Sequence, residues 1–173
     1  MAVLPIVTYP DPVLTKACPP AERIDDELRR LANDMVETMF AAETGIGLAA
    51  PQVGRLVSLV VVESDPVNRN GQALCLFNPR IVSAQGEETA EEGCLSLPDH
   101  YAPVTRAAQV VVQALDRDGK PLRVEAEGLL ARCLQHEIDH LRGRLVLDYE
   151  SPLKRALYRK RRLKELKRRR RAS

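Results

Sequence analysis

The chain has 173 residues, 45% of them hydrophobic and 29% charged, which is typical of one globular domain with a core of ordinary size. No apolar run approaches the length needed to cross a bilayer, and the N-terminus lacks the charged and apolar regions of a signal peptide. The four cysteines form no CxxC pair. We therefore expect reduced thiols, a cytoplasmic protein and no association with membranes.

The net charge of +2 conceals two regions of opposite charge. Residues 151–173 carry 12 Lys or Arg and one acid, a charge of +11, whereas residues 1–150 carry 14 basic and 23 acidic residues, a charge of −9. We expect residues 1–150 to form the main domain, which would carry any active site. Residues 151–173 should form a basic helix and tail, within the same domain or appended to it.

The first half of the chain predicts one helix followed by strands. Asp25 can cap a helix that ends at Gly45. β-Branched residues dominate 56–62, which predicts a buried strand, and 73–77 and 80–83 predict short strands bent at the Asn-Pro pair between them. The apolar positions of the helix recur every three or four residues: Leu28, Leu31, Met35 and Met39.

The second half predicts a hairpin and then a helix. Residues 109–115 and 121–126 alternate as strands do, and the Asp-Arg-Asp-Gly turn between them predicts that they pair. Residues 129–141 predict a helix stopped by Gly143. This order favours an α+β fold, with antiparallel sheets packed around a central helix.

The basic segment predicts a further helix that docks at its beginning and projects at its end. Residues 167–171 are five consecutive cations, which repel one another and should fray. An incomplete apolar stripe predicts the docking face: Leu153, Leu157, Leu163 and Leu166.

The predicted helix at 129–141 contains a catalytic metal-site pattern, His136-Glu137-Ile138-Asp139-His140. Positions i and i+4 lie on one face of a helix, so the two imidazoles can bind one cation together. Glu137 is close enough to act on water at that cation without ligating it. This HExxH arrangement is typical of metal-dependent hydrolases.

Two histidines leave a catalytic metal one protein ligand short of the usual three, and cysteines are the candidates. Cys133 lies on the same helix face, but it is seven residues from His140, about 10 Å of helix rise, which argues against it. Cys94 follows Gly93, which allows the backbone to approach another group closely. Cys94 is therefore the better candidate on spacing.

Three separated stretches resemble the signature motifs of peptide deformylases: residues 45–52 (GIGLAAPQ), 92–96 (EGCLS) and 136–140 (HEIDH). The resemblance extends over most of the chain, including residues 145–152 and the basic C-terminal helix of bacterial-type enzymes. It implies a hydrolase that releases formate from the N-formylmethionine of nascent proteins.

The resemblance also implies the metal and the site. Cys94, His136 and His140 would be the ligands and Fe²⁺ the physiological metal, with Zn²⁺, Ni²⁺ or Co²⁺ as substitutes, although this ligand chemistry alone favours zinc. Glu137 would be the general acid and base, and the Gln52 amide and the Leu95 N–H would stabilise the oxyanion. The residues implied for substrate binding are Gly45, Ile46, Gly93, Leu129 and Cys133.

Two residues depart from the family pattern: Arg132 replaces a more usual apolar residue near the methionine pocket, and Tyr101 stands where many bacterial relatives carry Arg. We interpret His100 as an exposed loop histidine. Glu92 and Asp139 are acids that can either hold the imidazole N–H groups or form structural salt bridges.

Two other functions compete with this one. A zinc peptidase of the HExxH type would need a third ligand, but the histidine expected in one such class falls at Val146. A ribosome- or RNA-binding module would rest on the basic tail. We expect the tail to serve instead for docking on the ribosome near the exit of the peptide tunnel, with no sequence-specific nucleic-acid binding and a monomeric protein.

Overall fold

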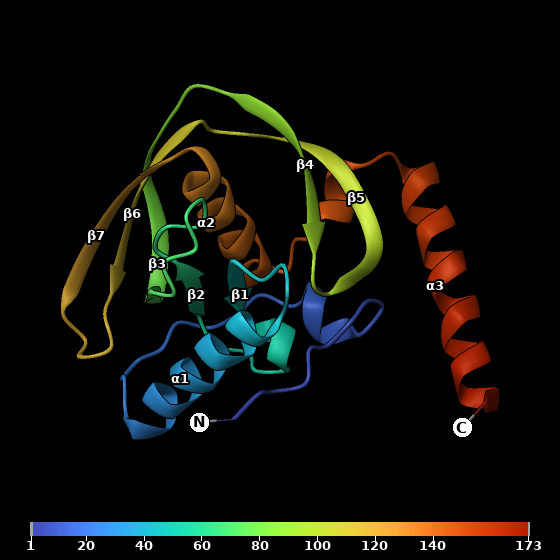
Figure 1. Cartoon of the computed structure of the whole chain (residues 1–173), viewed down its shortest axis with the longest axis horizontal. Helices are drawn as coiled ribbons and strands as arrows, with labels where there is room; N and C mark the ends of the chain where they lie inside the picture. The colour runs from blue at the N-terminus through green and yellow to red at the C-terminus, as the bar shows by residue number, and fades with distance from the viewer. Residues whose placement is uncertain (1, 173) are drawn as a thin grey trace.

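A computed structural model describes residues 2–172 and has the predicted α+β fold (Figure 1). The α-helices are α1 (Asp26–Ala41), α2 (Gly128–Leu141) and α3 (Pro152–Ala172). The main antiparallel sheet, in the order β1-β2-β3-β6-β7, contains β1 (Gly47–Ala49), β2 (Leu59–Glu63), β3 (Ala73–Gln85), β6 (Gln109–Leu115) and β7 (Pro121–Glu127). The second sheet pairs β4 (Glu88–Cys94) with β5 (Leu97–Arg106). Short 3₁₀ helices are η1 (Pro12–Thr15), η2 (Ala50–Val53) and η3 (Val146–Tyr149).

Strand β2 is buried on both faces, which explains its uninterrupted apolar sequence. Val60 and Val62 belong to the core that contains α2, whereas Leu59 and Val61 belong to the core that contains Met35 of α1. Because side chains alternate along a strand, the two helices pack against opposite faces of the sheet. The strand itself begins at Leu59, three residues later than predicted.

Helix α2 lies between the main sheet and the β4–β5 hairpin (Figure 1). Leu134, Ile138 and Leu141 pack into the core against the main sheet. The prediction that Gly143 stops α2 is confirmed: Gly143 has φ +72°, and a Cβ there would lie 2.5 Å from the Thr15 carbonyl oxygen. Helix α2 is therefore held between the main sheet and the β4–β5 hairpin.

The β4–β5 hairpin escaped the sequence analysis. Its first strand, ETAEEGC, is polar and largely exposed, so it lacks the apolar alternation that reveals a half-buried strand. Strand β3 was predicted as two pieces, but it is continuous. Asn78, at φ +51°, makes a bulge between Phe77 and Arg80, so pairing with β6 resumes after the Asn-Pro pair.

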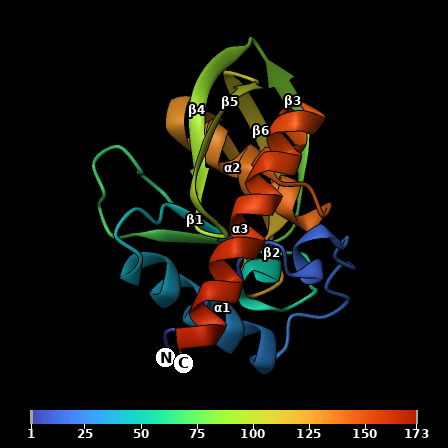
Figure 2. The same cartoon turned by 90° about the vertical axis from the view of Figure 1, so that its right-hand side faces the viewer.

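Helix α3 stands along one side of the molecule, and its docking face differs from the prediction (Figure 2). The buried residues are Tyr158 and Arg162, while Leu153 is 69% and Leu157 58% exposed. The leucine stripe is therefore wrong as a docking face. The helix itself continues to Ala172. Among the described residues no helix has the length and apolarity of a membrane span.

Candidate metal centre and active site

The two layers around α2 bring Cys94, His136 and His140 together. Cys94 ends β4, and the histidines lie one turn apart on α2. Their ligand atoms all lie within 4.8 Å of one another, and Cys94 Sγ is 3.4 Å from His140 Nε2. Sulfur and nitrogen ligands of one tetrahedral metal are about 3.5 Å apart, so these residues fit a divalent cation.

Behind the centre lies a group of paired charges that we call the Glu92 network: Glu92, Arg106, Arg132, Asp139 and Tyr149. Glu92 accepts from both Arg106 Nε (2.6 Å) and Arg106 Nη2 (2.8 Å), from Arg132 Nη1 (2.8 Å), and contacts His136 Nδ1 at 2.9 Å. The contact at Nδ1 leaves Nε2 of His136 available to a metal.

The neighbouring charges determine the protonation state of Glu92. Burial raises the pKa of Glu92, but Arg106 and His136 lower it more, so the pKa falls to about 2. Glu92 is therefore a carboxylate that holds the His136 imidazole. Asp139 contacts Arg106 Nη1 (2.9 Å) and accepts from Tyr149 Oη (2.5 Å), so of the two acids considered only Glu92 holds an imidazole.

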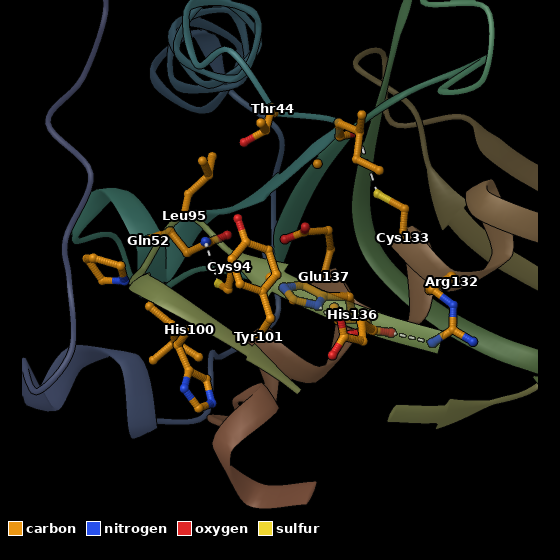
Figure 3. A pocket seen from close by; sticks show the side chains of 18 of the residues that line it. Thr44, Gln52, Cys94, Leu95, His100, Tyr101, Arg132, Cys133, His136 and Glu137 are labelled. Atoms are coloured by element: carbon orange, nitrogen blue, oxygen red, sulfur yellow. Dashed lines mark hydrogen bonds and ion pairs between the residues drawn. The ribbon is translucent and has the colours of Figure 1, made fainter. Parts of the chain in front are cut away.

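Glu137 points from α2 into the cavity beside the centre (Figure 3). It is 4% exposed, and burial raises its pKa to about 7. The neighbouring glycine of β1 makes room for it: a Cβ on Gly47 would lie 2.6 Å from Glu137 Oε1 and 2.6 Å from Cys133 Sγ. Sequence analysis passed over this role of Gly47, although the residue lies in the GIGLAAPQ motif.

Gln52 and Leu95 lie on the other side of the cavity (Figure 3). The Gln52 amide is oriented by the Ala49 N–H, which donates to its oxygen at 2.8 Å. Its Nε2 donates to Ser96 Oγ (3.2 Å) and faces Cys94 Sγ at 3.6 Å. One amide N–H is thus directed toward the centre. Leu95 follows Cys94 in the β4–β5 turn.

The cavity has a volume of about 450 Å³ and is bounded by both layers. Its lining includes every residue that the resemblance implies for substrate binding: Gly45, Ile46, Gly93, Leu129 and Cys133. The Cys133 thiol donates to the Ile46 carbonyl at 3.5 Å, and burial raises its pKa well above the usual value. Cys133 therefore presents a neutral, apolar wall.

The side chains that depart from the family pattern have clear positions. Arg132 is 9% exposed, and beyond Glu92 it donates to the carbonyls of Val104 (2.9 Å) and Glu88 (2.7 Å), so it fastens the β4–β5 hairpin to α2. Arg106 anchors the same network and was missed, because an isolated arginine carries no signal in a single sequence.

His100 is not an exposed loop residue. Its Nε2 lies 2.7 Å from Glu150 Oε2, and its ring lies 4.5 Å from that of Tyr158. It points away from the centre in Figure 3. His100 therefore joins the lip of the cavity to the beginning of α3.

Comparison with known proteins agrees with this geometry. The sequence profile of the polypeptide deformylase family matches residues 3–156. The peptide deformylase of Syntrophobacter fumaroxidans is 50% identical over 167 residues, covering 96% of this chain and 98% of that protein.

Solved structures agree as well. The crystal structure of a peptide deformylase from Legionella pneumophila superposes with a TM-score of 0.87 at 48% identity, covering 96% of each chain. That of Ehrlichia chaffeensis peptide deformylase in complex with actinonin gives a TM-score of 0.89 at 40% identity, covering 95% of this chain and 98% of that chain.

The fold and the clustered ligands define a metal-dependent hydrolase. The chain belongs to the polypeptide deformylase family, and it removes the formyl group from nascent peptides.

Proposed function

We propose that this chain performs deformylation of N-formylmethionyl peptides at the site formed by Cys94, His136, His140 and Glu137. The observation that carries the proposal is a buried carboxylate, Glu137, directly beside three side chains whose ligand atoms could hold one metal ion. Cys94, His136 and His140 would hold a divalent cation, which supplies a Lewis acid that acidifies water and polarises a carbonyl.

Glu137 is the proton carrier of this mechanism. Its carboxylate takes a proton from the attacking water and later delivers it to the departing amine. Gly47 leaves the space in which the carboxylate sits, and burial keeps bulk water from competing for the proton. Burial raises the pKa of Glu137, which favours uptake of the proton that it later releases.

Gln52 and Leu95 are proposed to stabilise the oxyanion that forms when water adds to the formyl carbon. The Gln52 N–H that faces Cys94 Sγ is directed toward the place where this charge develops. A sulfur contact of 3.6 Å is weak, so the N–H can turn to a negatively charged oxygen at little cost. The Leu95 backbone N–H, in the tight turn after Cys94, would be the second donor.

The peptide is proposed to bind in extended form between two sheet edges. Strand β1 ends the main sheet, and within residues 2–172 β4 pairs with β5 alone, so each strand has one edge available. Ile46 and Gly93 would contact the peptide backbone. Gly45, Leu129 and Cys133 would bound the methionine side chain.

The experiment that tests the function compares formyl-Met-Ala-Ser with acetyl-Met-Ala-Ser and with unformylated Met-Ala-Ser. We expect the first peptide to release formate and the acetyl peptide to release no acetate, since the extra methyl of the acetyl group would crowd the centre. Cleavage of the Met-Ala bond in the unformylated peptide would instead support the alternative, a zinc peptidase. That alternative is weakened because Val146, where a third histidine would stand, is buried in η3.

Fe²⁺ is proposed as the resident metal, on the basis of the motif resemblance, with Zn²⁺, Ni²⁺ or Co²⁺ as substitutes. Metal analysis of protein purified without oxygen should give about one iron per chain, and activity should decay in air because an Fe²⁺–thiolate centre oxidises. Equal, air-stable activity of the zinc form would contradict this assignment.

The basic helix is proposed to bring the enzyme to the ribosome. Residues 1–150 would carry the chemistry and 151–173 the docking helix, acting as a monomer in the cytoplasm. The support is the +11 charge of this segment, which suits rRNA phosphates. Co-sedimentation with ribosomes should fall steeply with added salt and with deletion of residues 166–173. Undiminished binding after that deletion would refute this role.

A further inference from the structure

The segment before η1 lies between α3 and the β4–β5 turn (Figure 1). The Val7 N–H donates to the Gln52 carbonyl at 2.7 Å, and the Tyr9 N–H donates to the Ser96 carbonyl at 2.8 Å. Gln52 belongs to η2, and Ser96 belongs to the β4–β5 turn. Residues 7–9, which we call the bridging segment, therefore join the two parts of the chain that carry the proposed oxyanion donors.

The Ser96 side chain also holds the Gln52 amide. Ser96 is 0% exposed, and its hydroxyl oxygen accepts from Gln52 Nε2 at 3.2 Å. At the other end of the amide, the Gln52 side-chain oxygen accepts from the Ala49 N–H at 2.8 Å. Because the amide group is planar, these two contacts also fix the direction of its second N–H. That N–H faces Cys94 Sγ at 3.6 Å.

Helix α3 holds the bridging segment from the other side. Arg162 is 3% exposed, and it donates to the Tyr9 carbonyl at 3.1 Å and to Thr8 Oγ1 at 3.0 Å. The Tyr9 ring lies 5.7 Å from the Tyr158 ring. Val7 and Tyr9 both pack against the buried cluster that contains Tyr158, so they act on Gln52 from outside the cavity.

From these contacts we infer that Ser96 and the bridging segment, which Arg162 secures, are positioning residues for deformylation. They hold the Gln52 amide in the orientation that receives the oxyanion. The inference rests on the proposed function. A donor is most effective when its direction is set before the charge develops, because no reorganisation is then needed during the reaction. Loss of a positioning contact should therefore lower kcat and leave KM and metal content unchanged.

The test is a double-mutant cycle with formyl-Met-Ala-Ser as substrate. Ser96→Ala should lower kcat about threefold to tenfold, and Arg162→Leu about twofold to fivefold, as expected for lost buried hydrogen bonds. In a Gln52→Leu background each substitution should change kcat by less than about twofold, because no amide is left to position. Arg162→Lys keeps a donor for the Tyr9 carbonyl and should retain most of the activity. Arg159→Leu removes an exposed arginine of α3 and is the control, with no change expected in either background.

A second measurement needs no turnover. In zinc-loaded protein, nuclear magnetic resonance can follow the side-chain amide protons of Gln52, which are assigned by their absence from Gln52→Leu. Ser96→Ala should speed the hydrogen exchange of these protons by about threefold to tenfold, because one of them loses its acceptor. Arg159→Leu should leave the exchange unchanged.

The outcomes separate a positioning role from a merely structural one. If Ser96→Ala or Arg162→Leu lowers kcat as much in the Gln52→Leu background as in the wild type, the positioning role is overturned. A loss confined to KM overturns it as well. If the wild-type protein releases no formate, the proposed function fails instead. The exchange measurement then still decides the orientation of Gln52, and unchanged exchange in Ser96→Ala would overturn the inference.

Discussion

Two regions of this molecule are rich in arginine, and they use it differently. In the Glu92 network Arg106 and Arg132 are less than 10% exposed and reach carboxylate oxygens at 2.6–2.9 Å. In α3 most cations face solvent, and Arg162 is the buried exception, held by the Tyr9 carbonyl (3.1 Å), Thr8 Oγ1 (3.0 Å) and Glu165 (2.9 Å).

The difference shows what burial does to a guanidinium. A buried guanidinium that donates several hydrogen bonds fixes the positions of its partners, whereas an exposed cation attracts anions over a Debye length without fixing geometry. The first region should therefore control metal binding and chemistry, and the second should control where the enzyme binds. Substitutions at the metal centre, which the network supports, should have the largest effects on metal binding and activity. Truncations at the end of α3 should have the smallest.

The two cysteines of the cavity provide the largest expected contrast. Cys94→Ala removes one of three clustered ligand atoms, so the protein should lose tight metal binding and essentially all activity. Cys133→Ala changes a wall and should retain stoichiometric metal. Metal analysis after gel filtration measures both. The assignment is wrong if Cys133→Ala loses the metal while Cys94→Ala keeps it.

Glu137→Gln should be nearly as damaging, but by another route. The amide keeps the shape beside Gly47 and cannot accept the proton, so kcat should fall by about 10³–10⁴ with metal content unchanged. Single-turnover assays on metal-loaded protein would show this. Activity like that of the wild type would exclude Glu137 as the proton carrier.

Gln52→Leu removes one proposed oxyanion donor at similar volume. We expect kcat to fall by a few hundredfold, about 3 kcal/mol, because the lost interaction forms only in the transition state. Circular dichroism should report an intact fold. A change confined to KM would place Gln52 in ground-state binding instead.

Arg132→Leu tests the network itself. It leaves Glu92 with Arg106 and His136 but removes the fastening of β4 to α2, so metal affinity should fall about tenfold, the lower end for groups that orient a metal ligand. Competition with a chelator measures it. Arg123→Leu removes an exposed arginine of β7 and is the control, with no expected change. Equal losses of metal affinity in both variants would show that burial of the arginine does not determine the effect.

The sequence predicted the strongly periodic elements and the three motifs, because these signals are local. α1, α2 and the β6–β7 hairpin lie close to their predicted ranges. The β4–β5 hairpin was not recognised, since β4 is polar and is held by Arg106 and Arg132, which meet Glu92 across large sequence separations. The same holds for the role of Gly47, which depends on how closely α2 approaches β1.

The prediction of the docking face of α3 failed for a related reason. A leucine stripe is the usual signal, yet the contact that forms uses an aromatic ring and a guanidinium directed at backbone oxygens. Tyr158 Oη donates to the Pro98 carbonyl (3.1 Å), and its ring lies against His100 and Tyr9. Backbone carbonyls of segments distant in the chain leave no trace in the sequence of the helix.

The contacts of Tyr158 and Arg162 determine where α3 can be truncated. Truncation after Glu165 is the change with the smallest expected effect on turnover. Deletion of residues 166–173 removes five cations but keeps Arg162 and its partner Glu165, so turnover of formyl-Met-Ala-Ser should stay within about twofold. Deletion from Lys160 also removes Arg161 and Arg162, which hold Asp99 and the N-terminal segment.

The longer deletion should therefore lower the free energy of unfolding by about 2 kcal/mol, or the melting temperature by roughly 4–8 °C, through the lost charge-assisted hydrogen bonds. Thermal unfolding of the two truncated proteins, with initial rates on the small peptide, separates the effects. If the shorter deletion reduced turnover more than fivefold, the exposed cations would be acting on the centre, and the contrast between the two arginine-rich regions would fail.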